Sequence, residues 1–372
     1  MRRLKKRALG IALSGAAAGG LALAGAAGAS AATLPGGGSA HGSVYISTNS
    51  TTGNQVEAFS RSADGTLSLA GTYNTGGTGS TTAAFGQGAV TLSADGQTLL
   101  VVDAGSNQVS DFAVLPGGAL RLRNTVASGG TQPTSVAISG GLAEVLNSGG
   151  AGNVAGFRAT PLGLAPIARG SQPLSAAANM PKDIAISPDG RHVVVTEKIS
   201  DTIDTFTVGF LGTLAPAVTT PSDSALSFAE VFAPSGQLLV ADDGASDTSA
   251  VSPYRIAPNG TLIATQPAVT DGQTAACWVS LGQDGNVFAD NAGSASIASY
   301  QLSASGQLTF LGNTSTGNGG PLDNTVSSDG QNLYAVIGNQ DQLAEFGIGP
   351  DAQLTAVGTQ ALPAGSAGVA AS

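Results

Sequence analysis

The feature that most constrains this sequence is a short motif, Gly-x-Leu or a close relative, that recurs seven times. Clear copies are Asp64-Gly65-Thr66-Leu67 and Asn259-Gly260-Thr261-Leu262. The leucines that close the seven copies are Leu67, Leu120, Leu164, Leu214, Leu262, Leu308 and Leu354. A spacing of roughly 44 to 53 residues is typical of a repeat protein in which each copy forms one structural unit.

A second motif falls between these copies and consists of two short apolar runs joined by a turn. The clearest copy turns at Ser187-Pro188-Asp189-Gly190, and others turn at Ser93–Gly96 and Ser327–Gly330. Asp-Gly between apolar runs is a strong hairpin signal, because glycine accepts the positive φ that the turn requires. Two hairpins per unit give four strands per unit, which predicts an all-β, seven-bladed β-propeller. A β-sandwich is the alternative, but it does not predict seven matched units.

The first and last units indicate how the ring closes. The first unit begins at Val44-Tyr45-Ile46-Ser47, in the position of a second strand, and therefore lacks its inner strand. Residues 363–372 resemble the inner strand expected at 133–139. We expect the C-terminal strand to complete blade one, which leaves no open sheet edge in a single propeller domain over residues 43–372.

The N-terminus reads as a secretory signal peptide over residues 1–32. Five basic residues precede an Ala-, Leu- and Gly-rich stretch, and Ala29-Ser30-Ala31 offers the small-x-small cleavage pattern. A membrane anchor is the competing interpretation, but glycine and serine dilute the apolar stretch. We expect a secreted, extracellular protein with a short flexible segment at 33–42 and no membrane span in the mature chain.

The charge balance limits the classes of partner that we expect. Without the signal peptide the chain would keep nine basic and 24 acidic residues. Such a surface repels nucleic acid and anionic lipid, so we expect neither as a partner. We expect a monomer whose partner is a small molecule or another extracellular ligand. The single cysteine, Cys277, excludes an intramolecular disulfide and is expected to be a small buried hydrophobe.

These units resemble the lactonase-like seven-bladed propellers, which include 6-phosphogluconolactonase and carboxymuconate cyclase, and the related YVTN-type propellers. The resemblance rests on the seven units and on phrases such as Ser187–Gly190, Thr196-Glu197-Lys198 and Thr202–Phe206. It covers about residues 43–372 and is specific for the fold. It implies hydrolysis or formation of a lactone ring, although a fold alone does not fix a function.

Two kinds of loop share the face of a propeller on which ligands usually bind. Loops between second and third strands contain Asp103, Asn147, Glu197-Lys198, Asp242-Asp243 and Asn291. Loops that link one blade to the next contain Gln87, Lys182-Asp183, Phe228–Glu230, Thr274–Trp278 and Asp323-Asn324. We therefore predict a pocket lined by Asp103, Asn147, Lys182, Glu230, Asp242, Trp278, Asn291 and Asn324.

Lactone hydrolysis needs a base that activates water and a group that stabilises the oxyanion. Glu197 and Lys198 are the pair that we predict for these roles. The alternative is an ion pair at an exposed strand end, since adjacent strand residues point in opposite directions. Trp278 could stack on a ligand or pack between blades, and packing is the commoner role at such a position.

Calcium is a further option, because it prefers carboxylate and amide oxygens. Glu197, Asn147, Asn291 and Asp242 would be its ligands, although their spacing does not match a known calcium loop. Few basic groups are expected near the pocket, namely Lys182, Lys198 and Arg169, and His41 and His192 are expected away from it. This scarcity argues against a phosphorylated substrate and so against a true 6-phosphogluconolactonase.

The sequence thus predicts a secreted hydrolase of an unphosphorylated lactone, with a carboxylate base in the central pocket. A non-catalytic extracellular binding or scaffold propeller is the alternative. Convergence of Glu197, Asp103 and Asp242 in one pocket would favour the hydrolase, whereas loops filling the channel would favour the binding protein.

Overall fold

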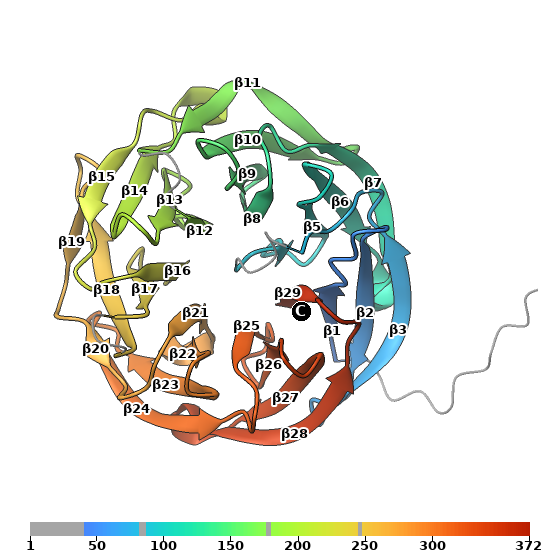
Figure 1. Cartoon of the computed structure of the whole chain (residues 1–372), viewed down its shortest axis with the longest axis vertical. Coiled ribbons are helices and arrows are strands. Elements are labelled where there is room, and N and C mark those ends of the chain that lie inside the picture. Colours follow the sequence, from blue (N-terminus) through green and yellow to red (C-terminus); the bar gives the residue numbers. More distant parts are fainter. Residues whose placement is uncertain (1–40, 82–86, 176–179, 245–247) are drawn as a thin grey trace, which may run out of the picture. The chain divides into compact units, whose positions relative to one another are not determined.

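The described residues form seven antiparallel sheets arranged in a ring, as the sequence predicts, each with four main strands and one with a short fifth strand (Figure 1). The structure is a computed structural model and describes residues 41–81, 87–175, 180–244 and 248–372. The expected signal peptide and nearly all of segment 33–42 lie outside the described residues. No helix in these described ranges is long and apolar enough to cross a membrane.

Each blade runs from an inner strand near the axis of the ring to an outer strand at its rim. Blade 1 contains, in that order, β29 (Ala367–Ala371), β1 (Ser43–Ser47), β2 (Gln55–Arg61) and β3 (Leu67–Asn74). Blade 2 contains β4 (Val90–Leu92), β5 (Thr98–Asp103), β6 (Gln108–Val114) and β7 (Leu120–Ala127). Blade 3 contains β8 (Pro133–Ser139), β9 (Leu142–Asn147), β10 (Asn153–Thr160) and β11 (Gly163–Pro173). Blade 4 contains β12 (Pro181–Ile186), β13 (His192–Glu197), β14 (Thr202–Thr207) and β15 (Val218–Pro221).

Blade 5 contains β16 (Ser227–Phe232), β17 (Leu238–Asp242), β18 (Ala250–Ile256) and β19 (Leu262–Ala264), with β20 (Val269–Thr270) also paired to β18. Blade 6 contains β21 (Ala276–Leu281), β22 (Asn286–Asn291), β23 (Ser296–Leu302) and β24 (Leu308–Ser315). Blade 7 contains β25 (Pro321–Val326), β26 (Asn332–Ile337), β27 (Gln342–Ile348) and β28 (Leu354–Ala361). Four short 3₁₀ turns lie between described strands: η1 (Pro116–Gly118), η2 (Phe210–Gly212), η3 (Gln283–Gly285) and η4 (Pro350–Ala352).

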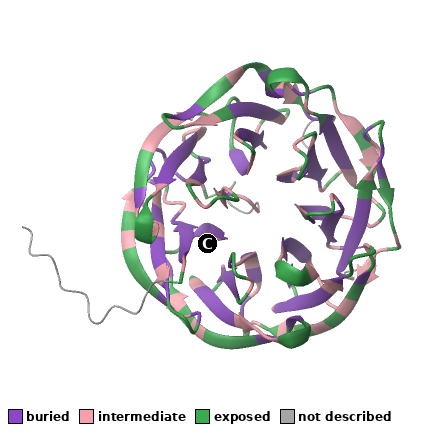
Figure 2. Cartoon of the chain, turned by 180° about the vertical axis from the view of Figure 1, so that it is seen from behind, coloured by how far each residue is buried: buried purple, intermediate pink, exposed green. Residues whose placement is uncertain are grey.

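Burial explains why the strand sequences differ across a blade. The second strands are covered on both faces by neighbouring blades, so they are apolar on consecutive residues. Val193, Val194 and Val195 in β13 are fully buried. Outer strands such as β28 alternate instead, because one of their faces is exposed to solvent. Figure 2 shows this gradient, with buried residues toward the centre and exposed ones around the rim.

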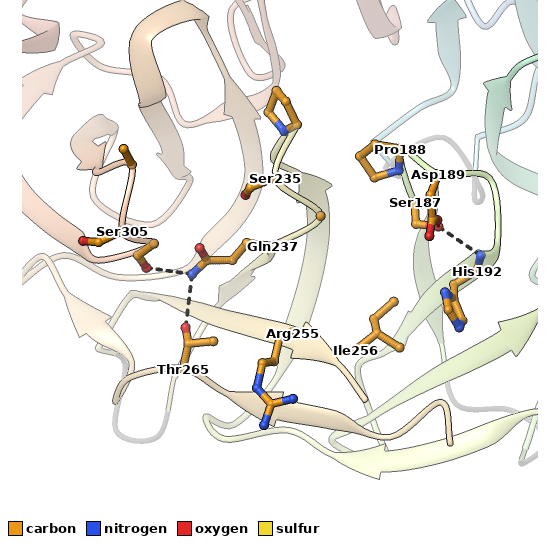
Figure 3. Close-up of a pocket in the computed structure, with 14 residues that line it drawn as sticks. Ser187, Pro188, Asp189, His192, Ser235, Gln237, Arg255, Ile256, Thr265 and Ser305 are labelled. Carbon is orange, nitrogen blue, oxygen red and sulfur yellow. Dashed lines mark hydrogen bonds between the residues drawn. The ribbon is translucent and has the colours of Figure 1, made fainter. Parts of the chain in front are cut away.

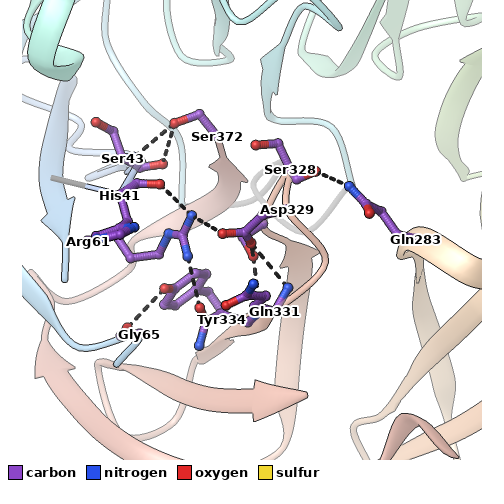
Figure 4. Close-up of polar contacts among 12 residues, drawn as sticks. His41, Ser43, Arg61, Gly65, Gln283, Ser328, Asp329, Gln331, Tyr334 and Ser372 are labelled. Atoms are coloured by element: carbon purple, nitrogen blue, oxygen red, sulfur yellow. Dashed lines mark hydrogen bonds and ion pairs between the residues drawn. The ribbon is translucent and has the colours of Figure 1, made fainter. Parts of the chain in front are cut away.

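The C-terminal strand closes the ring, as expected. β29 pairs antiparallel with β1, where Tyr45 lies opposite Ala370. The blade 1–blade 7 junction is held by Arg61, whose guanidinium contacts Asp329 Oδ2 at 2.7 Å and Asn332 Oδ1 at 3.0 Å (Figure 4). The Tyr334 hydroxyl donates to Gly65 O at 2.9 Å across the same junction. Arg61 is 2% exposed, so these contacts replace the water that its charge would otherwise bind.

Candidate functional site

A central cavity of about 420 Å³ is lined by the inner strands of all seven blades. This volume lies in the range of small-molecule pockets. Gln87 and the carboxyls of Asp183, Glu230 and Asp323 define a polar end of the cavity, and the lining residues that follow them in their strands are mostly apolar. The apolar wall is formed by Val90, Ile138, Ile184, Ile186, Phe232, Leu281 and Val326. A cavity of this kind favours a small ligand with an apolar body and a polar end.

Gln87 spans the polar end of the cavity. It precedes β4 in blade 2, yet its Nε2 donates to Glu230 O at 3.3 Å in blade 5 and its Oε1 accepts from Val279 N at 2.8 Å in blade 6. The amide of Gln87 therefore crosses the axis of the propeller and bounds the cavity at this level.

Two carboxylates at the polar end join neighbouring inner strands. Asp183 accepts from Ser135 Oγ in blade 3 at 2.8 Å and from the backbone N–H of Glu230 in blade 5 at 3.1 Å. Asp323 in blade 7 accepts from the backbone N–H of Val369 in blade 1 at 3.0 Å. Both inner strands have an irregular register at this level, for example between Pro181 and Ile184. The irregularity leaves backbone N–H groups outside the ladder, and the carboxylates satisfy them.

Glu230 differs from these two carboxylates, because its side-chain oxygens receive no hydrogen bond from the described residues. It is 2% exposed. The nearby Thr196 hydroxyl donates to Phe228 O, so its proton is not available to Glu230. Burial, reinforced by the negative charge of Asp183, raises the pKa of Glu230 well above its usual value. Its buried surroundings therefore favour the protonated form of Glu230, which can itself donate a hydrogen bond.

Asp183 differs from Glu230 in that donors satisfy its carboxylate. Burial raises the pKa of Asp183 to about 7, while its hydrogen bonds from Ser135 and two backbone N–H groups oppose that rise. Burial, together with the charge of Asp290, raises the pKa of Asp323 well above its usual value. The cavity thus combines one carboxyl whose pKa is raised to about 7 with two whose pKa values burial raises well above their usual values. General acid–base catalysis requires neighbouring carboxyls with different pKa values, so that one acts as the base and the other as the acid.

The amide of Asn324 also lines the cavity. It is 4% exposed, and its Oδ1 accepts from Ser280 Oγ in blade 6. Asp290 lies beside this amide, and burial raises the pKa of Asp290 well above its usual value. The orientation of Asn324 is therefore fixed by blade 6.

Lys182 and Lys198 gather around Phe228, at the polar end of blades 4 and 5. Their Nζ atoms lie 4.7 and 4.6 Å from the centre of the Phe228 ring, which is typical of cation–π contacts. Lys198 also pairs with Asp243 Oδ2 at 3.3 Å. Burial, followed by the charge of Lys198, lowers the pKa of Lys182. The cluster therefore places two ammonium groups over one aromatic ring, and one of them is paired with Asp243.

Trp278 belongs to the core and not to a ligand surface. It is 2% exposed, and its ring lies 5.2 Å from that of Phe228. Its neighbour Cys277 is 6% exposed, and burial raises the pKa of this thiol to about 12. Both side chains pack between blades 5 and 6.

Glu197 and Lys198 are not brought together. Glu197 is fully buried, and its Oε2 accepts from Ser200 Oγ at 3.2 Å and from Thr202 Oγ1 at 3.3 Å in its own blade. Lys198 extends instead toward Asp243 in blade 5. The two adjacent side chains therefore point to different neighbours, as the alternation of a strand requires.

The other predicted loop residues occupy the position equivalent to Glu197 in their own blades. Each is the last residue of a second strand and is fully buried: Asp103, Asn147, Asp242 and Asn291. Asp103, for example, accepts from Thr75 Oγ1 and Ser110 Oγ, both at 2.6 Å. They do not line the central cavity. Asp103, Asp242 and Glu197 thus hold the loops of separate blades and do not converge.

The oxygen ligands suggested for calcium are dispersed for the same reason. Glu197, Asn147, Asn291 and Asp242 end four different second strands in four blades. In the part of the chain that the structure describes, no group of three or more His, Cys, Asp or Glu residues is arranged to hold a metal ion.

Comparison with known proteins identifies the family. The family described as "Lactonase, 7-bladed beta-propeller" matches residues 44–148 and 259–369, which together exceed half of the chain. No curated protein sequence matches the chain significantly.

Solved structures show the same fold. A putative 6-phosphogluconolactonase from Bacteroides fragilis has a TM-score of 0.68 at 20% identity, with 91% of this chain and 100% of that chain covered. A periplasmic gluconolactonase from Pseudomonas aeruginosa has a TM-score of 0.69 at 17% identity, with 89% and 98% covered. At these identities the likeness concerns the fold. Together with the family match, it shows that this chain belongs to the lactonase family of seven-bladed β-propellers.

Proposed function

We propose that the protein is a secreted hydrolase that opens an unphosphorylated lactone in the central cavity, with Asp183 as the base and Glu230 as the acid. The observation that carries this proposal is the pair of neighbouring buried carboxyls at the polar end of the cavity, of which Asp183 accepts hydrogen bonds and Glu230 receives none from the described residues. Pockets with apolar walls and perturbed carboxyls are frequent active sites.

The chemistry follows from the two protonation states. Ionised Asp183 takes a proton from a water molecule as its oxygen attacks the lactone carbonyl. Protonated Glu230 donates a hydrogen bond to the developing oxyanion and then its proton to the ring oxygen as the carbon–oxygen ring bond breaks. The product is a hydroxy acid. The proton taken by Asp183 then passes to Glu230, which returns both carboxyls to their starting protonation states. The carboxylate of the product would be repelled by the acidic end of the cavity, which favours its release.

The lining of the cavity supports an unphosphorylated substrate. The described lining residues include three carboxyl groups and no lysine, arginine or histidine. A phosphate group needs cationic partners and would be repelled by the ionised carboxylate of Asp183. The named gluconolactonase among the structural neighbours is consistent with a substrate of this class. Asp183 and Glu230 lie outside the two segments that the family match covers, so the proposal rests on the geometry of this chain.

The test compares the hydrolysis of glucono-1,5-lactone and its 6-phosphate by the wild type and by Glu230→Gln, with the spontaneous rate subtracted. We expect turnover of the unphosphorylated lactone alone, and about 100-fold lower kcat/KM in the variant. Glu144→Gln is the matched control, because Glu144 is also a fully buried glutamate but does not line the cavity. Equal activity of Glu230→Gln and wild type would remove Glu230 from the mechanism, and loss of activity with a chelator would point to a metal.

Secretion is the second part of the proposal and rests on the pattern of residues 1–32. We expect the exported protein to begin close after Ala31, as intact mass measurement of the protein from culture medium would show. A protein found in the medium with Met1 retained would contradict the cleavage.

A non-catalytic binding propeller is the second candidate. Gln87 favours it, because its two hydrogen bonds across the axis place protein at the polar end of the cavity. In this case no lactone would be turned over, and Gln87→Ala would change ligand affinity without creating activity.

A further inference from the structure

A second cavity, of about 510 Å³, lies at the turns that join inner and second strands in blades 4 and 5 and third and fourth strands in blade 6. Blade 4 contributes the turn at Ser187–Asp189 and His192 (Figure 3). Blade 5 contributes residues 234–237 together with Arg255, and blade 6 contributes residues 304–306. The cavity therefore lies where three consecutive blades meet, and its volume suits one or two sugar-sized rings.

Gln237 presents a fixed hydrogen-bond acceptor to this cavity. Its side chain lines the cavity although it is only 8% exposed. Nε2 donates to Thr265 Oγ1 at 3.1 Å and to Gly306 O at 2.8 Å, so both amide hydrogens are used (Figure 3). The carbonyl Oε1 receives no hydrogen bond from a described residue. An acceptor oriented in this way suits a ligand hydroxyl, and little side-chain entropy is lost on binding.

The cavity also contains a guanidinium group that forms no ion pair with a described residue. Arg255 lines it, is exposed, and forms no ion pair or hydrogen bond within the described ranges. Asp189 also lines the cavity, but its Oδ1 is held by its own turn, through Ser187 Oγ at 2.6 Å and Arg191 N at 3.1 Å. Figure 3 shows Arg255 and His192 on either side of Ile256. A planar guanidinium binds a carboxylate through two parallel hydrogen bonds, in a bidentate contact.

From this arrangement we propose that the cavity binds a sugar acid. Its carboxylate contacts Arg255, and its hydroxyls donate to Gln237 Oε1. Pro188, Pro234 and Ile256 supply the apolar surface that a sugar ring packs against. This proposal does not depend on lactone hydrolysis, because it concerns a different cavity and a binding step.

The two histidines of the sequence allow a direct test by NMR on the tag-free mature protein. His192 lines the cavity, whereas His41 lies beside Arg61 at the blade 1–blade 7 junction. D-glucuronate and D-galacturonate are titrated into the protein at millimolar concentrations, and glucose serves as the uncharged control sugar. We expect the imidazole signals of His192 to shift with the acids and those of His41 to stay unchanged. No shift of His192, or equal shifts with glucose, would overturn the proposal.

Variants then locate the carboxylate contact. Arg255→Ala is expected to weaken the binding of glucuronate at least tenfold. Arg121→Ala is the control and is expected to leave glucuronate binding unchanged. Arg121 lies in the outer strand of blade 2, is exposed and forms no ion pair with a described residue. Equal weakening by both variants would show a general charge effect and overturn the site. Tighter binding of tri-galacturonate than of galacturonate would assign the site to an acidic polysaccharide, and equal binding would assign it to a free sugar acid.

Discussion

At the scale of single residues, the important contrast is between two sets of buried carboxyls. Glu197, Asp103 and Asp242 each accept hydrogen bonds from nearby hydroxyl groups. Glu230 has no such donors, although it is equally buried. A buried carboxyl that accepts several hydrogen bonds fixes the conformation of the loop around it. A buried carboxyl that accepts none can exchange a proton with a substrate.

Glu197→Gln is therefore expected to act on stability more than on turnover. The change replaces one acceptor oxygen by a donor among Ser175, Ser200 and Thr202 and so disturbs their hydrogen bonds. We expect a loss of about 1–3 kcal/mol in the free energy of unfolding, measured by denaturant titration. A variant with unchanged stability and strongly reduced lactone turnover would restore Glu197 as the base.

The sequence identified the right kinds of loop but could not rank the residues within them. Lys182-Asp183, Phe228–Glu230 and Asp323-Asn324 follow from the blade repeat. Which of these side chains reaches the cavity depends on register shifts at the start of the inner strands, as between Ser227 and Glu230. A shift of one residue exchanges the two faces of a strand, and no composition signal marks it.

At the scale of elements, β29 is the strand that completes the architecture. It supplies the inner strand of blade 1 and pairs with β1. The missing strand of the first unit and the strand-like C-terminus predicted this closure from the sequence. The Arg61 contacts at the same junction were not predictable, because they join residues about 270 positions apart.

Truncation after Ala361 is expected to lower the melting temperature by more than about 10 °C, since it removes an inner strand and exposes the edge of β1. Thermal unfolding measures this change. A synthetic peptide with the sequence of residues 362–372 should restore part of the loss. Unchanged melting of the truncated chain would refute closure by β29.

Arg61→Ala is expected to cost about 3 kcal/mol, because it leaves Asn332 and Asp329 without their donor at a buried junction. Asp329→Asn should cost less, because the Asp329 side chain is about one third exposed. Denaturant unfolding of both variants gives the comparison, and equal costs would contradict a special role for the buried guanidinium.

At the scale of the whole molecule, the buried carboxyls determine how stability depends on pH. Burial raises the pKa of Asp183 and Asp242 to about 7 and that of Glu144 to about 8. In the unfolded chain these groups lose their protons near pH 4. Between these values the folded state binds more protons than the unfolded state, so the free energy of unfolding falls as pH rises.

We therefore expect the protein to be more stable at pH 5 than at pH 8, with the loss spread over that interval. Glu144→Gln removes one of these titrating groups and should make the dependence less steep. Melting temperatures across pH 4 to 9 measure both effects. Stability that rises steadily from pH 5 to 8 would show that these carboxyls are ionised in the folded state.

The account depends most on catalysis by Asp183 and Glu230 in the central cavity, and the pH dependence of kcat/KM for lactone hydrolysis tests it most directly. The rate should rise as Asp183 ionises through about pH 7 and fall at higher pH as Glu230 loses its proton. Asp183→Asn should remove the rising limb, and Glu230→Gln the falling one. Turnover with the same pH profile in both variants and in the wild type would contradict the proposed site.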